Sequence, residues 1–393
     1  MDFFENEIPQ EEFQNQAKFH SYDRKYVKPV DPYNPFDNPT ENPEYNRDYG
    51  EVVPQIAIPG CELPFIPGKE EKKKIRNSYN IAGGGILLHI ASSVVIANIL
   101  YVIAMMIIIG INGISISDAF RNRADDISAI INNTSIFPGI TLISYLAANL
   151  LAFFIGCRFA GTKPSSLFRT KNLKVSDIIC YAVIGLFVQR VAAIALTALM
   201  QLLPNADLIG NSQVISYSGA KALIISTCYT CIIAPVTEEL LYRGFIMNTF
   251  SRVSQRFAIL ISAFFFGISH GNAAQFVLAF LLGIFMGYID IKHNSVLPSI
   301  FVHFFVNCFA GLSGIVTTYA GEGSVLLGLL GFVSVILFIA GLVLFILFAR
   351  KNTMPKMTIH QQFRCGKIAL TSPTTIISGI IYIILFAVTT FSS

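Results

Sequence analysis

The stretch that decides the fold is CYTCIIAPVTEELLYRGFIMNTF, residues 228–250, an apolar segment that contains two adjacent glutamates, Glu238 and Glu239. A charged side chain in the core of a bilayer costs about 2.5–3.5 kcal/mol on insertion scales. Of the 24 acidic residues, 15 lie in the first 78 positions and nine in the remaining 315, and we interpret these two glutamates as the only carboxylates well inside an apolar segment. The sequence therefore predicts that they act inside a membrane.

The composition places the whole chain in a bilayer. Hydrophobic residues make up 53% of the sequence, and the mean hydropathy is +0.59, which excludes an ordinary soluble domain. Apolar runs near 18 residues or longer recur along the chain and are typical of multiple membrane spans. The seven cysteines are scattered and predict no disulfide framework.

We expect three regions along the chain. Residues 1–78, rich in Pro, Asn and Glu, predict a disordered acidic tail that ends in the basic cluster KEEKKKIR, residues 69–76. Residues 79–350 predict a membrane domain, and residues 351–393 a basic loop followed by a last membrane helix. The basic cluster is typical of a cytoplasmic topology anchor.

The predicted fold is all-α, a polytopic membrane bundle of eight or nine transmembrane helices. Basic residues occur in alternate connections, which places the N-terminus in the cytoplasm and, with nine spans, the C-terminus outside. The ninth expected span is barely long enough to cross a membrane. The expected spans are roughly 82–111, 136–157, 178–203, 222–250, 257–271, 274–290, 296–318, 325–348 and 374–391.

Polar residues recur at helical spacing in three of these apolar segments. A spacing of four places two side chains on one helix face, whereas Glu238 lies about 100° away from Glu239. Counted from the cytoplasmic ends, the polar residues fall at similar depths, and Pro235 predicts a local break in its helix. The three pairs are Glu239 with Arg243, Phe266 with His270, and His303 with Asn307.

These residue types point to the activation of water. A carboxylate and an imidazole can together act as a general base, and a second imidazole and an amide can donate hydrogen bonds to an oxyanion. No good nucleophile lies at the same depth, because Cys308 points away from the face of Asn307. The expected reaction is therefore hydrolysis, and the expected substrate bond is a peptide bond.

At these residues the chain resembles the CAAX protease and bacteriocin-processing family, to which the type II CAAX prenyl endopeptidases are related. The family pattern EExxxR, FxxxH and HxxxN reads here as EELLYR from Glu238, FGISH from Phe266 and HFFVN from His303. All three motifs are intact. The resemblance covers about residues 140–320 and leaves out the tail and the last span.

The resemblance implies an intramembrane endopeptidase in which Glu238 and His270 activate water while His303 and Asn307 form the oxyanion site. Glu239 and Arg243 would support the site as an ion pair. No cofactor is expected; the alternative is a zinc ion held by Glu238, His270 and His303.

The implied partners are a peptide or protein substrate at the membrane and the lipid bilayer, not nucleic acid. Peptide maturation, bacteriocin processing or immunity in a bacterial cell membrane fits the family. Two other functions stay open, namely a catalytically silent regulator with the same fold and a proton-coupled transporter. The intact motifs favour the peptidase over the regulator, and the lack of inverted hydropathy repeats disfavours the transporter.

Overall fold

A computed structural model describes residues 69–391 apart from residues 133, 203–219, 253, 322, 353–366 and 369–370. Its regular elements are all helical, which confirms the predicted fold class. The predicted tail lies outside the described residues up to position 68. Among the described residues the first helix begins at Lys69, so the basic cluster predicted to end the tail forms the first two turns of this helix.

Helices occur at all nine expected spans, and seven of them are long and apolar enough to cross a membrane. These seven are α3 (Lys69–Ile111), α6 (Ile136–Ala160), α7 (Val175–Leu202), α13 (Ala273–His293), α14 (Leu297–Ala320), α15 (Val325–Lys351) and α17 (Pro373–Phe391).

The two remaining spans differ from an ordinary membrane helix. The fifth is α12 (Gln255–Ile268), whose 14 residues rise only about 21 Å. The fourth is divided into five consecutive helical pieces. They are α9 (Ala220–Cys228), the π-helix η3 (Tyr229–Ile233), α10 (Ala234–Glu239), the π-helix η4 (Leu240–Met247) and α11 (Asn248–Ser251).

Three short helices lie in two of the connections. Between α3 and α6 the chain forms α4 (Ile116–Asn122) and α5 (Ala124–Asn132), and between α6 and α7 it forms the 3-10 helix η2 (Pro164–Phe168). Helix ends carry the expected caps: Asn272 accepts the backbone N–H of Gln275 at the start of α13, and Ser324 accepts that of Leu327 at the start of α15.

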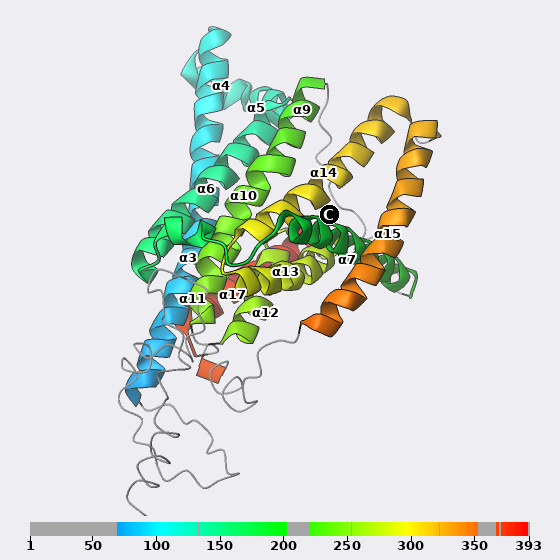
Figure 1. Cartoon of the computed structure of the whole chain (residues 1–393). Helices are drawn as coiled ribbons and strands as arrows, with labels where there is room; N and C mark the ends of the chain where they lie inside the picture. Colours follow the sequence, from blue (N-terminus) through cyan, green and yellow to red (C-terminus); the bar gives the residue numbers. More distant parts are fainter. Residues whose placement is uncertain are drawn as a thin grey trace, which may run out of the picture.

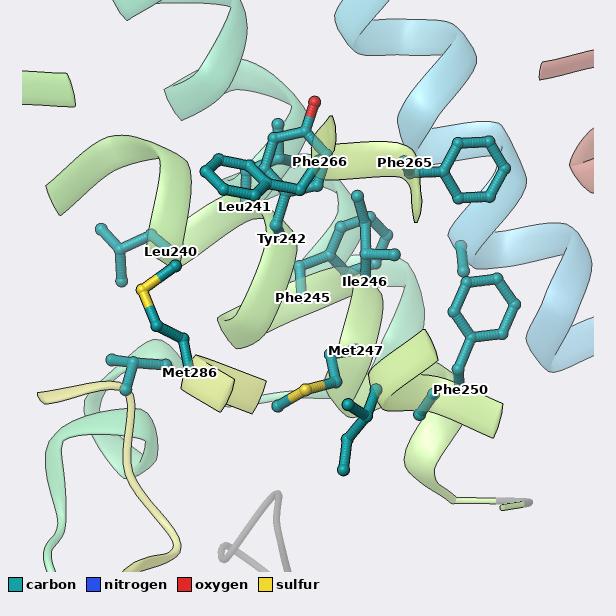
Figure 2. Close-up of a cluster of buried hydrophobic side chains, with 14 of the residues drawn as sticks. Leu240, Leu241, Tyr242, Phe245, Ile246, Met247, Phe250, Phe265, Phe266 and Met286 are labelled. Carbon is teal, nitrogen blue, oxygen red and sulfur yellow. The ribbon is translucent and has the colours of Figure 1, made fainter. Parts of the chain in front are cut away.

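The divided fourth span lies at the centre of the bundle. In Figure 1 the α9–α11 segment runs beside α6 and α3, and α12, α13 and α14 lie against its other side. The side chains of Leu240, Leu241, Phe245, Met247 and their neighbours are almost fully buried, as Figure 2 shows. The part of this segment formed by η4 and α11 is therefore enclosed by protein.

Glycines on the two outer helices let them approach this segment closely. A Cβ atom built on Gly85 of α3 would lie 2.1 Å from the ring of Phe245, and one built on Gly156 of α6 would lie 2.4 Å from it. Both contacts are far below van der Waals distance, so the Phe245 ring fills the space that side chains at Gly85 and Gly156 would occupy. This packing fixes the centre of the bundle, where the glutamates lie, against α3 and α6.

Candidate active site

The two glutamates lie on α10, a short α-helical piece between two π-helices. Pro235 stands in its first turn, and because proline has no N–H it removes one helical hydrogen bond there. The π-helix η3 lies directly before this turn, so the local break expected at Pro235 takes the form of a change in helix type. Single π-turns inside α-helices are frequent at functional sites.

Glu239 and Arg243 form a buried ion pair, as their spacing predicted. Nη1 of Arg243 donates to Oε1 of Glu239 over 3.0 Å, and both side chains are 0% exposed. The guanidinium also lies over the ring of Phe266, 4.2 Å from its centroid, in cation–π geometry. Arg243 thus joins the first motif to the second.

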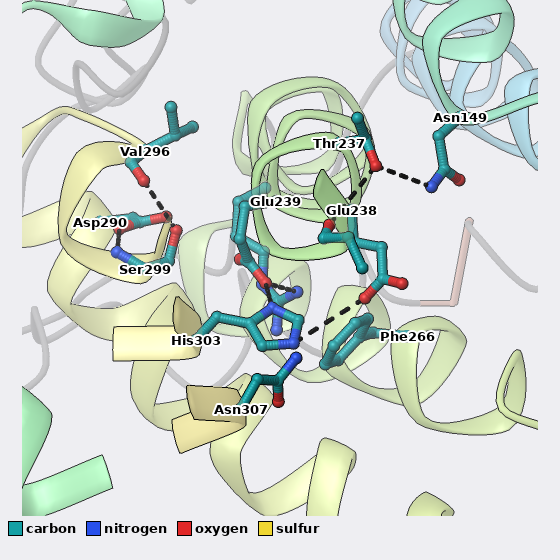
Figure 3. Close-up of polar contacts among 12 residues, drawn as sticks. Asn149, Thr237, Glu238, Glu239, Phe266, Asp290, Val296, Ser299, His303 and Asn307 are labelled. Atoms are coloured by element: carbon teal, nitrogen blue, oxygen red, sulfur yellow. Dashed lines mark hydrogen bonds and ion pairs between the residues drawn. The ribbon is translucent and has the colours of Figure 1, made fainter. Parts of the chain in front are cut away.

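His303 lies between the two glutamates, as Figure 3 shows. Its Nδ1 is 2.9 Å from Oε1 of Glu239, and its Nε2 is 3.9 Å from Oε2 of Glu238. The Glu239 carboxylate is paired with an arginine and can only accept, so Nδ1 carries the proton. The separation between Nε2 and Glu238 is too long for a direct hydrogen bond.

The exposure of the two glutamates differs. The Glu238 side chain is 23% exposed, whereas Glu239 is fully enclosed. Thr237 holds α10 against α6 because its hydroxyl accepts a hydrogen bond from the amide of Asn149 over 3.2 Å. Because Glu238 is the partly exposed glutamate, it is the one of the two that a substrate or water can reach.

His270 lies just beyond the end of α12. Phe266, the other residue of the FxxxH motif, holds it there. Its Nδ1 is 2.8 Å from the carbonyl oxygen of Phe266, which can only accept, so Nδ1 is the protonated nitrogen and Nε2 is left as an acceptor. The ring of Phe266 packs edge-on against His270 at 5.0 Å and against His303 at 5.6 Å between centroids. Phe266 thus contacts both imidazoles.

Asn307 follows His303 by one turn of α14. Its amide nitrogen donates to the carbonyl oxygen of Thr230 in the π-helix η3 over 2.8 Å, which leaves its second N–H and its carbonyl oxygen for other partners. The structure therefore joins Glu239, Arg243 and His303 by hydrogen bonds and places Glu238 3.9 Å from Nε2 of His303. His270 is connected to these residues through the ring of Phe266, and Asn307 lies one turn from His303 on α14.

The alternative zinc site finds no support in this geometry. Among the described residues, no group of three histidine, cysteine, aspartate or glutamate side chains is arranged to hold a metal ion. Glu238, His270 and His303 do not form such a group. We therefore derive no step that passes through a metal.

One buried carboxylate was missed by the sequence reading. Asp290 is 0% exposed, so the interpretation of Glu238 and Glu239 as the only carboxylates well inside an apolar segment is wrong. The predicted sixth span ends at residue 290, whereas α13 continues to His293 and keeps Asp290 inside the bundle. The signal was the apolar pattern around it, in GYIDI.

Comparison with known proteins agrees with the motifs. Residues 220–309 match the family model "Type II CAAX prenyl endopeptidase Rce1-like". This segment contains all three motifs, so the predicted resemblance is confirmed there. Together with the seven long apolar helices, the match makes the chain an integral membrane protein with a CAAX-protease-like core.

A curated bacterial protein is also similar to part of the chain. UPF0177 protein YxdF from Lactococcus lactis subsp. lactis (strain IL1403) is 33% identical over 81 residues, which are 20% of this chain and 45% of that protein. The similarity thus spans less than half of the relative's length. No solved structure matches the chain.

Proposed function

We propose that this protein is an intramembrane endopeptidase that hydrolyses a peptide bond with a water molecule activated by Glu238 and His270. The observation that carries the proposal is the position of His303, with one ring nitrogen on the buried Glu239–Arg243 pair and the other facing the accessible Glu238. The match of residues 220–309 to the CAAX endopeptidase family supports this reaction class.

The first step in this mechanism is attack by water on the peptide carbonyl carbon. Glu238 accepts one proton of the water, and Nε2 of His270, left free by the bond between Nδ1 and Phe266, accepts a hydrogen bond from the other O–H and orients the water. A new carbon–oxygen bond forms, and the carbonyl oxygen becomes an oxyanion.

The oxyanion is stabilised by His303 and Asn307. Nδ1–H of His303 donates to Glu239, and Nε2, which faces Glu238, donates to the oxyanion from the doubly protonated ring. Asn307 adds the N–H that Thr230 does not use. When the carbon–nitrogen bond breaks, Glu238 returns its proton to the leaving amine.

We propose that the substrate is a membrane-associated peptide or protein, and that the protein serves peptide maturation, bacteriocin processing or immunity in a bacterial cell membrane. The bacterial relative and the helices that are long and apolar enough to cross a membrane support this setting. The basic N-terminal turns of α3 support an N-terminus in the cytoplasm.

Peptide comparison tests the proposal directly. Membranes from cells that express the wild-type chain are compared with membranes that contain Glu238→Gln at the same level, and the released peptides are identified by mass spectrometry. We expect peptides that occur with the wild type alone, and their ends define the cleaved bond. Identical peptide sets from the two samples would contradict the proposal.

A further inference from the structure

Helix α13 carries none of the three motifs, yet it forms one wall of the site. Gly283 and Asp290 are seven residues apart and therefore lie on one face of the helix, two turns from each other. A Cβ atom at Gly283 would come within 2.9 Å of Nη2 of Arg243, so this face packs directly on the buried ion pair. Asp290 lies on the same face and is completely enclosed.

Asp290 binds the first turn of α14. Its Oδ1 accepts the backbone N–H of Ser299 over 3.0 Å. The first N–H groups of a helix have no partner within the helix, and the residue before it usually supplies one from its side chain. Here that residue is Val296, which has no side-chain acceptor, so Asp290 provides the missing cap from the neighbouring helix.

The capped turn leads directly to His303. Ser299 and His303 are four residues apart and share one face of α14, as Figure 3 shows. One end of this face is bound to α13 by Asp290, and the other is bound to α10 by the bond between His303 and Glu239. These two attachments fix both the rotation of α14 and its position along its axis.

We propose that Asp290 is a positioning residue of the active site, because its hydrogen bond to Ser299 sets the His303 ring against Glu239. This inference rests on the proposed peptidase function. Loss of the bond frees the first turn of α14, and His303 then moves away from the two glutamates. A displacement of about 1 Å in a reacting group can lower a rate about 10²-fold.

The test compares three variants of the full chain in lipid nanodiscs. Asp290→Asn keeps an oxygen acceptor for Ser299 and nearly the same volume, whereas Asp290→Ala removes the acceptor. Asp177→Ala is the matched control, because Asp177 also accepts a backbone N–H, that of Lys174 over 3.0 Å, at the start of α7, which carries no motif residue. The substrate is the peptide identified by the membrane comparison above.

Two quantities are measured for each folded variant. The first is kcat and KM across pH, and the second is the ring 15N signal of His303 in histidine-labelled protein, assigned with His303→Gln. We expect Asp290→Ala to lower kcat about 10²-fold with an altered pH profile and a changed His303 signal. Asp290→Asn and Asp177→Ala should keep the wild-type kcat, pH profile and signal.

Two results would overturn the inference. One is a wild-type kcat, pH profile and His303 signal in Asp290→Ala, which would reduce Asp290 to a structural cap. The other is equal impairment of Asp290→Asn and Asp290→Ala, which would assign the effect to charge and not to the bond with Ser299. The 15N measurement needs no substrate, so it tests the positioning of His303 even if the wild type cleaves no peptide and the proposed function fails.

Discussion

His303 donates its Nδ1–H to Oε1 of Glu239 over 2.9 Å, and the same oxygen accepts the Nη1–H of Arg243 over 3.0 Å. One carboxylate oxygen thus joins the first motif to the third. Glu239 holds these two side chains through Oε1 and is fully buried, which leaves the neighbouring Glu238 to meet a substrate. The distinction between the two glutamates follows from their partners and their exposure.

Arg243→Ala should destabilise the protein as well as inactivate it. The substitution leaves the Glu239 carboxylate buried without its cation, and removal of one partner of a buried pair costs about 3–5 kcal/mol. Unfolding in a denaturing detergent, followed by circular dichroism, measures the loss. Glu238→Gln is the control, since Glu238 is partly exposed and lies outside the ion pair; equal stability of the two variants would show that the pair has no structural role.

Gly283→Ala should also weaken the bundle. The added methyl group would meet Nη2 of Arg243 at 2.9 Å and Cβ of Ala263 at 3.0 Å, so the buried ion pair or α12 must shift. Overpacking of this kind costs about 1–3 kcal/mol. The same unfolding measurement applies, with Gly331→Ala on α15 as the control, because nothing lies within 4 Å of a Cβ atom there. Equal stability of both variants would refute the close packing of α13 on Arg243.

Peptide cleavage should not depend on a bound metal ion. The proposed reaction uses Glu238 as a base, and a zinc-bound Glu238 could not serve in that role. Purified protein treated with a strong chelator should keep its activity, and elemental analysis should find well under one zinc ion per chain. Activity that is lost on chelation and restored by zinc would instead assign Glu238, His270 and His303 as ligands.

Much of the site could be predicted because its residues are costly in a membrane. Glu239 and Arg243 are four residues apart in an apolar segment, and burial of both charges requires that they pair. Hydropathy predicted the positions of the helices, because backbone polar groups in lipid must be bonded within a helix.

Other features depend on contacts between distant parts of the chain. The spacing of HxxxN indicates a shared helix face. It does not reveal that His303 lies between two glutamates or that Asn307 donates to the carbonyl oxygen of Thr230. The role of Asp290 was hidden because its partner, Ser299, belongs to the next helix, and because the predicted span ended at residue 290. The two π-helices have no sequence signal beyond Pro235.

The most direct test of the account is a cleavage assay with Glu238→Gln. Wild type and variant are purified into the same lipid nanodiscs, shown to unfold at the same detergent concentration, and mixed in excess with the identified substrate peptide under single-turnover conditions. Glutamine keeps the shape of Glu238 but cannot accept a proton from water, so we expect a rate lower by about 10²–10⁴-fold. Cleavage by Glu238→Gln at the wild-type rate would contradict the account.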